Sequence, residues 1–226
     1  MDVSRRYFVG GAVAMVAGAS ASGVIAKPDN KIVWPNTTTP SEPAAPAVPA
    51  APKLAERPPL LQAALAALDK HGSRVGNRQR IGVVDFTEHS SQKRFQIVDV
   101  AHGAILGSYL VAHGRGSDPR HTGWVERLSN RPGSNASCPG SFVIASRYYG
   151  KHGVSRRLMG LDPENNLALE RAIVIHGASY VDRSLISAQG QIGRSLGCFA
   201  VAENEIAEVI SELGEGCLLY ASEARA

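Results

Sequence analysis

The sequence predicts a mainly β protein with a few helices, built as a single folded domain in the C-terminal three quarters of the chain. Short runs rich in β-branched and aromatic residues recur from residue 81 onwards, with polar or glycine-containing turns between them. Two stretches, near residues 60 and 205, have the apolar spacing of a helix. A content of 44% hydrophobic and 19% charged residues is typical of a globular protein.

Residues 1–26 predict an export signal. Arg5 and Arg6 stand before an uncharged run rich in Gly and Ala, which is typical of a signal read by the twin-arginine export machinery. The run is short for a helix that must cross about 30 Å of hydrocarbon. The pattern Ala19-Ser20-Ala21 favours cleavage, with an uncleaved membrane anchor as the alternative. Either way we expect the protein in the periplasm or cell envelope, meeting a membrane only through this segment.

Residues 27–59 predict a linker between this signal and the domain. Prolines and alanines dominate it, and because such a composition cannot form a core, we expect a disordered, extended and semi-rigid spacer. The predicted domain covers residues 60–226. Its first element is a short helix, because Leu61, Leu65 and Leu68 lie on one face before Gly72.

Three strand candidates follow the helix. Residues 81–86, 94–100 and 104–112 are β-branched and aromatic runs separated by short polar or glycine turns, which predicts an antiparallel meander. Residues 124–139 are rich in Asn, Ser, Gly and Pro and predict a long loop.

The remaining elements are predicted from shorter signals. Residues 141–145 form a strand candidate, and residues 172–175 are almost wholly apolar, as a strand buried on both faces would be. Residues 204–213 predict a helix capped by Asn204, and residues 217–220 predict a last strand.

Charge and cysteine content narrow the function classes. The formal net charge is +4, but Lys and Arg are scattered along the chain, which argues against nucleic-acid binding. The three cysteines leave at least one thiol unpaired within a monomer. A disulfide between Cys138 and Cys217 would leave Cys198 free, and the sequence leaves that pairing open because it does not give the distance.

Two short segments carry residues suited to thiol catalysis. An apolar strand candidate ends at His176-Gly177, and Cys198 follows behind Gly197. A histidine within reach of a thiol can take its proton and later return it to a leaving amine. Glycine beside the cysteine allows a substrate carbonyl to approach the backbone N–H groups. These residues alone leave open a buried thiol beside a turn histidine.

The pair belongs to a longer string of motifs. Ser195-Leu196-Gly197-Cys198 resembles the Ser-His-Gly-Cys signature of L,D-transpeptidases, and His176-Gly177 resembles the upstream His-Gly of that family. The resemblance to the murein L,D-transpeptidase catalytic-domain branch covers residues 81–220. It rests on residues 111–114, 128–130, 133–134, 150–153, 173–181 and 193–198.

This resemblance implies an L,D-transpeptidase-like β-sandwich or barrel and a reaction on peptidoglycan stem peptides. Cys198 would attack the carbonyl of the L,D bond before D-alanine, and an amine of a second stem would resolve the thioester into a 3→3 crosslink. His176 would act as base and then as acid, its ring oriented by a backbone carbonyl. Gly197 and Cys198 would supply oxyanion N–H groups, and Ser195 completes the candidate catalytic set. Neither a metal nor another cofactor is implied.

Two departures from the family pattern affect the expected reaction. Leu196 stands where the signature has histidine, and Phe199 follows the cysteine where the family often has an arginine close by. Arg194 is a candidate for binding a substrate carboxylate in place of that arginine. The alternative is that Arg194 is simply a solvated surface residue. Further candidates for substrate contacts are Gly177, Tyr180, Asn130 and Ser134, together with His113 and His152, which could line the cleft.

Three other functions stay open. Water could resolve the thioester, which would make the protein an L,D-carboxypeptidase that uses the same Cys198 and His176. A wall-binding protein with a decayed site is conceivable because the second histidine is missing, although the retained pair argues against it. The last alternative is a thiol peptidase with another substrate.

Overall fold

The computed structural model describes residues 58–222. The predicted export signal and the predicted linker up to residue 57 lie outside this range. The first helix begins at Pro59, so the last residue assigned to the linker belongs to the folded domain. Among the described residues, no helix has the length and apolar character needed to cross a membrane.

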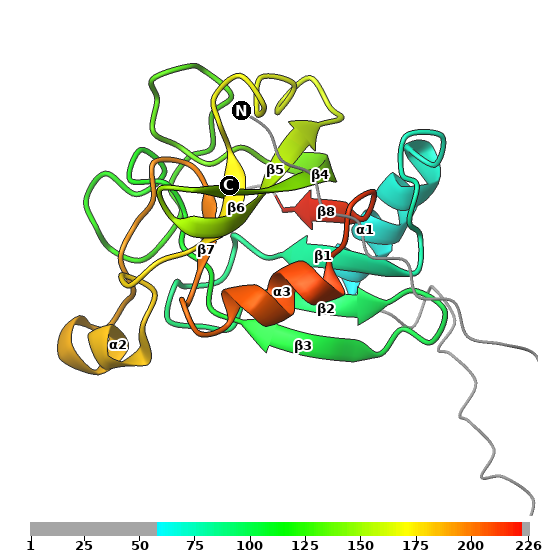
Figure 1. Cartoon of the computed structure of the whole chain (residues 1–226). Helices are drawn as coiled ribbons and strands as arrows, with labels where there is room; N and C mark the ends of the chain where they lie inside the picture. Colours follow the sequence, from blue (N-terminus) through cyan, green and yellow to red (C-terminus); the bar gives the residue numbers. More distant parts are fainter. Residues whose placement is uncertain (1–57, 223–226) are drawn as a thin grey trace, which may run out of the picture. The chain divides into compact units, whose positions relative to one another are not determined.

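Residues 58–222 form eight strands and three helices, which confirms the mainly β prediction (Figure 1). Their order is α1 (Pro59–Lys70), β1 (Arg80–Val84), β2 (Phe95–Asp99), β3 (Ile105–Tyr109), β4 (Gly140–Gly150), β5 (Gly153–Gly160), β6 (Val174–Gly177), α2 (Arg183–Gln189), β7 (Phe199–Val201), α3 (Ile206–Glu212) and β8 (Leu218–Ala221).

All eight strands belong to one sheet in the order β3-β2-β1-β8-β4-β5-β6-β7. The predicted meander is confirmed, because β1 pairs with β2 and β2 with β3, both antiparallel. Two pairs are parallel, β1 with β8 and β6 with β7. The chain after β3 returns to the opposite edge of the sheet, where Ala112 forms an antiparallel bridge to Ala200 of β7. This bridge brings the two edges together, so the sheet is nearly closed.

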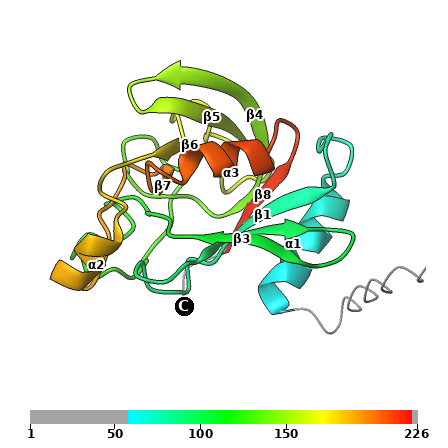
Figure 2. The same cartoon turned by 60° about the horizontal axis from the view of Figure 1, so that its bottom comes forward.

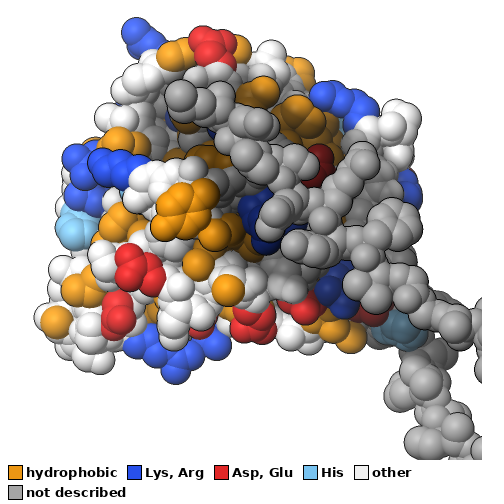
Figure 3. Space-filling view, in the orientation of Figure 1, with side chains coloured by type: hydrophobic (Ala, Val, Ile, Leu, Met, Phe, Trp, Pro, Cys, Tyr) orange, Lys and Arg blue, Asp and Glu red, His pale blue; other side chains and the backbone are white. Residues whose placement is uncertain are grey.

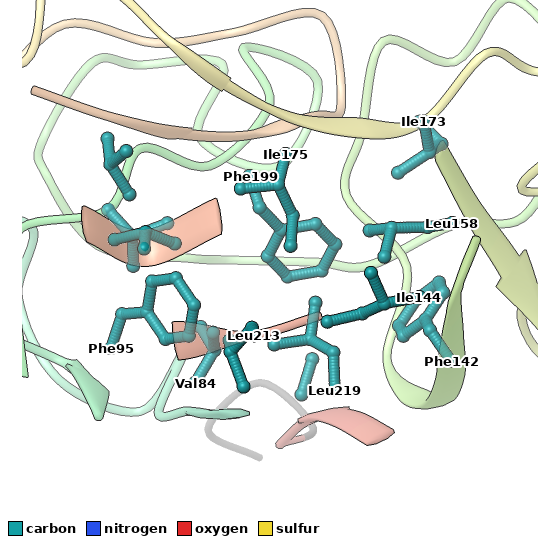
Figure 4. Packing of buried hydrophobic residues seen from close by; sticks show 14 of the residues in the cluster. Val84, Phe95, Phe142, Ile144, Leu158, Ile173, Ile175, Phe199, Leu213 and Leu219 are labelled. Carbon is teal, nitrogen blue, oxygen red and sulfur yellow. The ribbon is translucent and has the colours of Figure 1, made fainter. Parts of the chain in front are cut away.

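The sheet packs a separate core on each of its faces. The larger core contains Val209 and Leu213 at α3 together with Phe142, Ile175 and Phe199 from the strands (Figure 4). In both Figure 1 and Figure 2, α3 lies between the β4–β5 hairpin and the β1–β3 strands. On the other face, apolar residues of α1 pack on β1 and β8. The buried leucine face of α1 is the one that its spacing predicts.

Three elements and one cap differ from the sequence-based expectations. The sequence did not predict β5, α2 or β7, and it predicted Asn204 as the cap of the last helix. That cap is wrong: Glu205 holds the N-cap position, in helical backbone geometry and without a side-chain hydrogen bond. Cys138 and Cys217 are both buried free thiols, so the disulfide that the sequence left open is not formed.

Candidate active site

The parallel pair of β6 and β7 places the two predicted reacting residues on one face of the sheet. Ile175 lies opposite Phe199 and His176 opposite Ala200, and both Ile175 and Phe199 point into the larger core. Because side chains alternate along a strand, His176 points to the other face, and so does Cys198, which directly precedes β7. The two residues are diagonal neighbours across adjacent strands.

The His176 imidazole is held in one tautomer. Its Nδ1–H donates to the backbone carbonyl of Gly177 over 2.8 Å, and because a carbonyl can only accept, the proton must be on Nδ1. Nε2 is therefore left with a lone pair. Burial of the ring lowers the pKa of His176, and the nearby His152 lowers it further against the opposing Gly177 bond. The ring is neutral at neutral pH, so Nε2 is competent as a base.

The Cys198 thiol is in a resting arrangement. Within residues 58–222 its Sγ donates to the carbonyl of Ala172, at 3.6 Å. Burial raises the pKa of Cys198, against the opposing effects of the Val174 backbone and the Arg171 guanidinium. The thiol is therefore protonated at rest, and within the described residues no hydrogen bond joins its Sγ to His176.

A serine and a glycine shape the turn before Cys198. Ser195 Oγ donates to the Cys198 carbonyl at 2.7 Å and accepts from the Gly197 N–H at 3.1 Å. Gly197 has a φ of 121°, and a Cβ there would lie 2.8 Å from the Ala136 carbonyl, so only glycine fits. Because its N–H is bonded to Ser195, Gly197 does not offer the oxyanion donor that the resemblance implies. The Cys198 N–H is the donor left for that role.

Arg171 is a residue near the nucleophile that the sequence analysis missed. Its guanidinium donates to the carbonyls of Ser129, at 2.8 Å, and Ala136, at 2.5 Å, and to Ser134 Oγ at 3.3 Å. These bonds tie the long loop before β4 to the chain entering β6. They also hold a positive charge that favours the Cys198 thiolate.

His113 does not line a cleft as the sequence suggested. Its side chain is buried, Arg94 donates to its Nδ1 at 2.7 Å, and its Nε2–H donates to Asp118 at 3.3 Å. Burial and the Arg94 charge lower the pKa of His113 to about 3. The His113 carbonyl accepts from the Ser195 N–H at 2.8 Å. His113 therefore supports the nucleophile segment from behind, where a substrate cannot contact its ring.

Three further predicted substrate contacts have hydrogen-bond partners within the protein. Arg194 donates to the backbone carbonyl of Asp118, which engages one side of its guanidinium within the protein. The Asn130 amide donates to Pro163 and Asn166 and accepts from the Leu167 N–H. Ser134 bonds to Arg171, as described above. These three side chains stabilise loops around the site in this structure.

Tyr180 and Gly177 lie at a cavity of about 710 Å³ beside His176. Burial and, to a smaller extent, the nearby Cys198 raise the pKa of Tyr180 to about 12. Other lining residues come from the β4–β5 hairpin and from α3 with the residue leading into it: Arg147, Lys151, His152, Glu203, Ile206 and Ile210. The cavity lining thus combines basic, acidic and apolar side chains.

Figure 3 shows basic and acidic side chains mixed over the part of the Figure 1 face where described residues are visible. Among residues 58–222, no group of three or more His, Cys, Asp or Glu side chains is placed to hold a metal ion.

The sequence profile described as L,D-transpeptidase catalytic domain matches residues 53–222. The chain belongs to this family. A comparison with curated proteins finds no match. The transpeptidase motifs lie at the site just described: His176-Gly177 ends β6, and Ser195 to Cys198 lead into β7.

Solved L,D-transpeptidase structures are among the similar folds. One from Mycobacterium smegmatis is 12% identical, with a TM-score of 0.40, and the match covers 64% of this chain and 58% of that one. L,D-transpeptidase 3 from Mycobacterium tuberculosis, in complex with a faropenem-derived adduct, is 12% identical, with a TM-score of 0.42. That match covers 64% of this chain and 60% of the other. An L,D-transpeptidase from Xylanimonas cellulosilytica is 16% identical, with a TM-score of 0.38, and the match covers 70% of this chain and 68% of the other. The chain spans about three fifths of the length of the first two.

This member of the L,D-transpeptidase family differs at the signature position 196. The Leu196 side chain is 58% exposed, while its neighbours Ser195 and Gly197 are buried. The side chain at this position therefore points outward from the turn that carries the nucleophile.

Proposed function

We propose that this domain is a peptidoglycan L,D-transpeptidase in which Cys198 is the nucleophile and His176 the general base. The observation that carries the proposal is the tautomer of His176. Its Nδ1–H is held by the Gly177 carbonyl, so Nε2 keeps its lone pair, and β6 lies beside β7, which Cys198 directly precedes. A histidine with one nitrogen held and one free is what proton transfer from a thiol requires.

Acylation begins when Cys198 leaves the Ala172 carbonyl and gives its proton to Nε2. The thiolate then attacks the carbonyl that precedes D-alanine, and the developing oxyanion is met by the Cys198 N–H. The C–N bond breaks as the imidazolium returns the proton to the leaving amine. A thioester on Sγ and free D-alanine result, with His176 neutral again.

Transfer to a second stem peptide repeats the proton movements in reverse. An amine attacks the thioester carbonyl, loses its proton to Nε2, and the Sγ–C bond breaks. Sγ takes the proton back from the imidazolium, and a 3→3 crosslink is released. Attack by water would instead give the carboxypeptidase reaction.

The cavity beside His176 supports a peptide substrate with free carboxylates. Arg147 and Lys151 are its basic lining residues, and neither forms an ion pair within the described residues. Ile206 and Ile210 add apolar lining. Stem peptides carry carboxylates next to short aliphatic side chains, which matches this combination of charges and apolar surface.

The decisive experiment incubates the purified protein with disaccharide-tetrapeptides and analyses the products by mass spectrometry. Crosslinked dimers with released D-alanine support transpeptidation, and tripeptide monomers alone support the carboxypeptidase. Full activity in a Cys198→Ala variant would falsify the assignment of the nucleophile. A carbapenem adduct on Cys198 but not on the variant is an independent readout of the same thiol.

We also propose that the protein reaches the periplasm or cell envelope through the twin-arginine machinery. Arg5 and Arg6 before the Gly/Ala-rich run support this route. Cell fractionation tests it: replacing both arginines by lysine is expected to keep the protein inside the cell, and unchanged export would overturn the proposal.

A further inference from the structure

A second histidine lies against the proposed base. The rings of His152 and His176 stack with their centroids 4.2 Å apart and their planes at 27°. His176 is only 2% exposed, whereas His152 is an exposed residue on the wall of the 710 Å³ cavity. One face of the His176 ring is therefore covered by His152, which lies towards the cavity.

The β4–β5 hairpin holds His152 in this place. Gly150 pairs with Gly153 across a turn of two residues, Lys151 and His152. Gly153 has a φ of 69°, which lets the chain reverse tightly. Three residues after His152, Ser155 pairs directly with His176 of β6. The stack therefore joins a hairpin turn to the neighbouring strand of the same sheet.

We propose that His152 is a positioning residue for the base, which fixes the plane of the His176 ring so that Nε2 points along the sheet face towards Cys198. The inference rests on the proposed function. The hydrogen bond from Nδ1 to Gly177 holds one edge of the ring, but the ring can still rock about that bond. A second ring against its face removes this freedom.

The geometry excludes a proton relay between the two rings. Imidazole N–H bonds lie in the plane of the ring, so a stacked partner at 4.2 Å is not in line with either nitrogen. What the stack supplies is orientation, and the nearby His152 also lowers the pKa of His176. Both effects favour the neutral, correctly aimed base.

The test compares three variants on this hairpin. His152→Ala removes the stack, His152→Phe keeps a flat ring without nitrogens, and Tyr149→Ala changes a neighbouring residue that is 83% exposed. We expect His152→Ala to lower kcat for acylation roughly 10- to 100-fold with little change in KM, because small misplacements of a reacting group have costs of this size. His152→Phe should stay within about threefold of wild type, as should Tyr149→Ala. Thermal unfolding of each variant checks that the domain is folded.

A spectroscopic readout separates this inference from the proposed function. In ¹⁵N-histidine NMR of the free protein, the His176 ring should show a single tautomer in wild type and His152→Phe, with its Nδ1–H protected from exchange with water. In His152→Ala it should exchange faster with water. This measurement needs no substrate, so it stands even if no crosslinking activity is found.

Two results would overturn the inference. One is full kcat in His152→Ala; the other is a His152→Phe variant as impaired as His152→Ala, which would mean that the imidazole nitrogens themselves are needed. The pH profile of acylation is a further check. Its interpretation has to include the other titratable groups around His152 and His176. These are Lys151 and Arg147 on the hairpin, Glu203 before α3, Tyr180 after β6 and Cys198 before β7.

Discussion

His113 and His176 each end an apolar run, and each is followed by a glycine. Both rings are buried, and in both burial lowers the pKa of the imidazole. They differ in how their nitrogens are used. His113 has Arg94 on Nδ1 and Asp118 on Nε2, whereas the described contacts of His176 engage only Nδ1, with the Gly177 carbonyl.

This difference explains why one histidine supports the fold and the other can do chemistry. A ring with both nitrogens bonded inside the protein has no lone pair or proton to exchange with a substrate. The His113 ring lies behind the segment that carries Cys198 and stabilises that segment. A ring whose described contacts engage only one nitrogen can act as a base, as we propose for His176. The local sequence His-Gly is common to both and does not distinguish them.

The largest expected effect is on the rate of reaction when the free nitrogen is removed. His176→Ala should lower kcat for acylation roughly 100- to 10,000-fold, the range for loss of a general base, and should leave the thermal midpoint within a few degrees of wild type. Stopped-flow measurement of thioester or carbapenem-adduct formation tests this. A variant with half the wild-type rate would remove His176 from the mechanism.

The converse effect is on stability when the satisfied histidine is removed. His113→Ala leaves Arg94 and Asp118 buried without their shared partner, and such losses cost about 3 kcal/mol or more of the free energy of unfolding. Urea denaturation measures it. His113→Gln is the matched control, because its amide can accept from one partner and donate to the other, so we expect a smaller loss. Equal stability of all three proteins would contradict the structural role of this ring.

Sequence reasoning found most of the strands and helices and missed β5, α2 and β7. The strand β5 contains Arg156 and Arg157 and was not predicted, and β7 has only three residues directly behind the nucleophile. No residue of α2 is buried, so it has no apolar period. Its end signals were present, however: the Asp182 carboxylate accepts from the Ser184 N–H, and Gly190 closes the helix with a φ of 80°.

The site divides in the same way. Cys198 and His176 follow from short motifs because the reacting groups are adjacent to glycines that shape the backbone. Arg171 could not be found, since its partners Ser129 and Ala136 lie 42 and 35 residues away in the sequence. Such contacts depend on how the long loop folds against β6. The same holds for the stack of His152 on His176, which needs the register of β5.

A pH series sharpens the comparison further. The folded-state pKa of His113 is about 3, below the value of about 6.5 for an unfolded chain. Below pH 6.5 the unfolded state therefore takes up a proton that the folded state does not. Stability from this group is full above that pH and falls by about 1.4 kcal/mol per pH unit as pH decreases towards 3. Urea midpoints at pH 7 and pH 5 should show this slope in wild type, reduced in His113→Gln.

A smaller effect is expected at the clamp formed by Arg171. Arg171→Gln removes a positive charge that favours the Cys198 thiolate, so the pKa of the thiol should rise further. At pH 7 the rate of alkylation by iodoacetamide should fall roughly three- to tenfold. Arg171→Lys keeps the charge but not the forked hydrogen bonds to the loop, and it separates the electrostatic from the structural part. An unchanged alkylation rate in both variants would show that the thiol does not sense this cation.

The smallest expected effect is at the signature position where the family has a histidine. The Leu196 side chain is 58% exposed, so Leu196→Ala should change the free energy of unfolding by less than about 0.5 kcal/mol and, for the same reason, leave the acylation rate nearly unchanged. If His152 orients the base, the reaction does not depend on a side chain at position 196. A double variant, Leu196→His with His152→Ala, then tests whether an imidazole on the nucleophile turn can replace the stacked one. Recovery of the rate lost in His152→Ala would mean that the two positions serve the same ring, whereas no recovery would confine the orienting role to the β4–β5 hairpin.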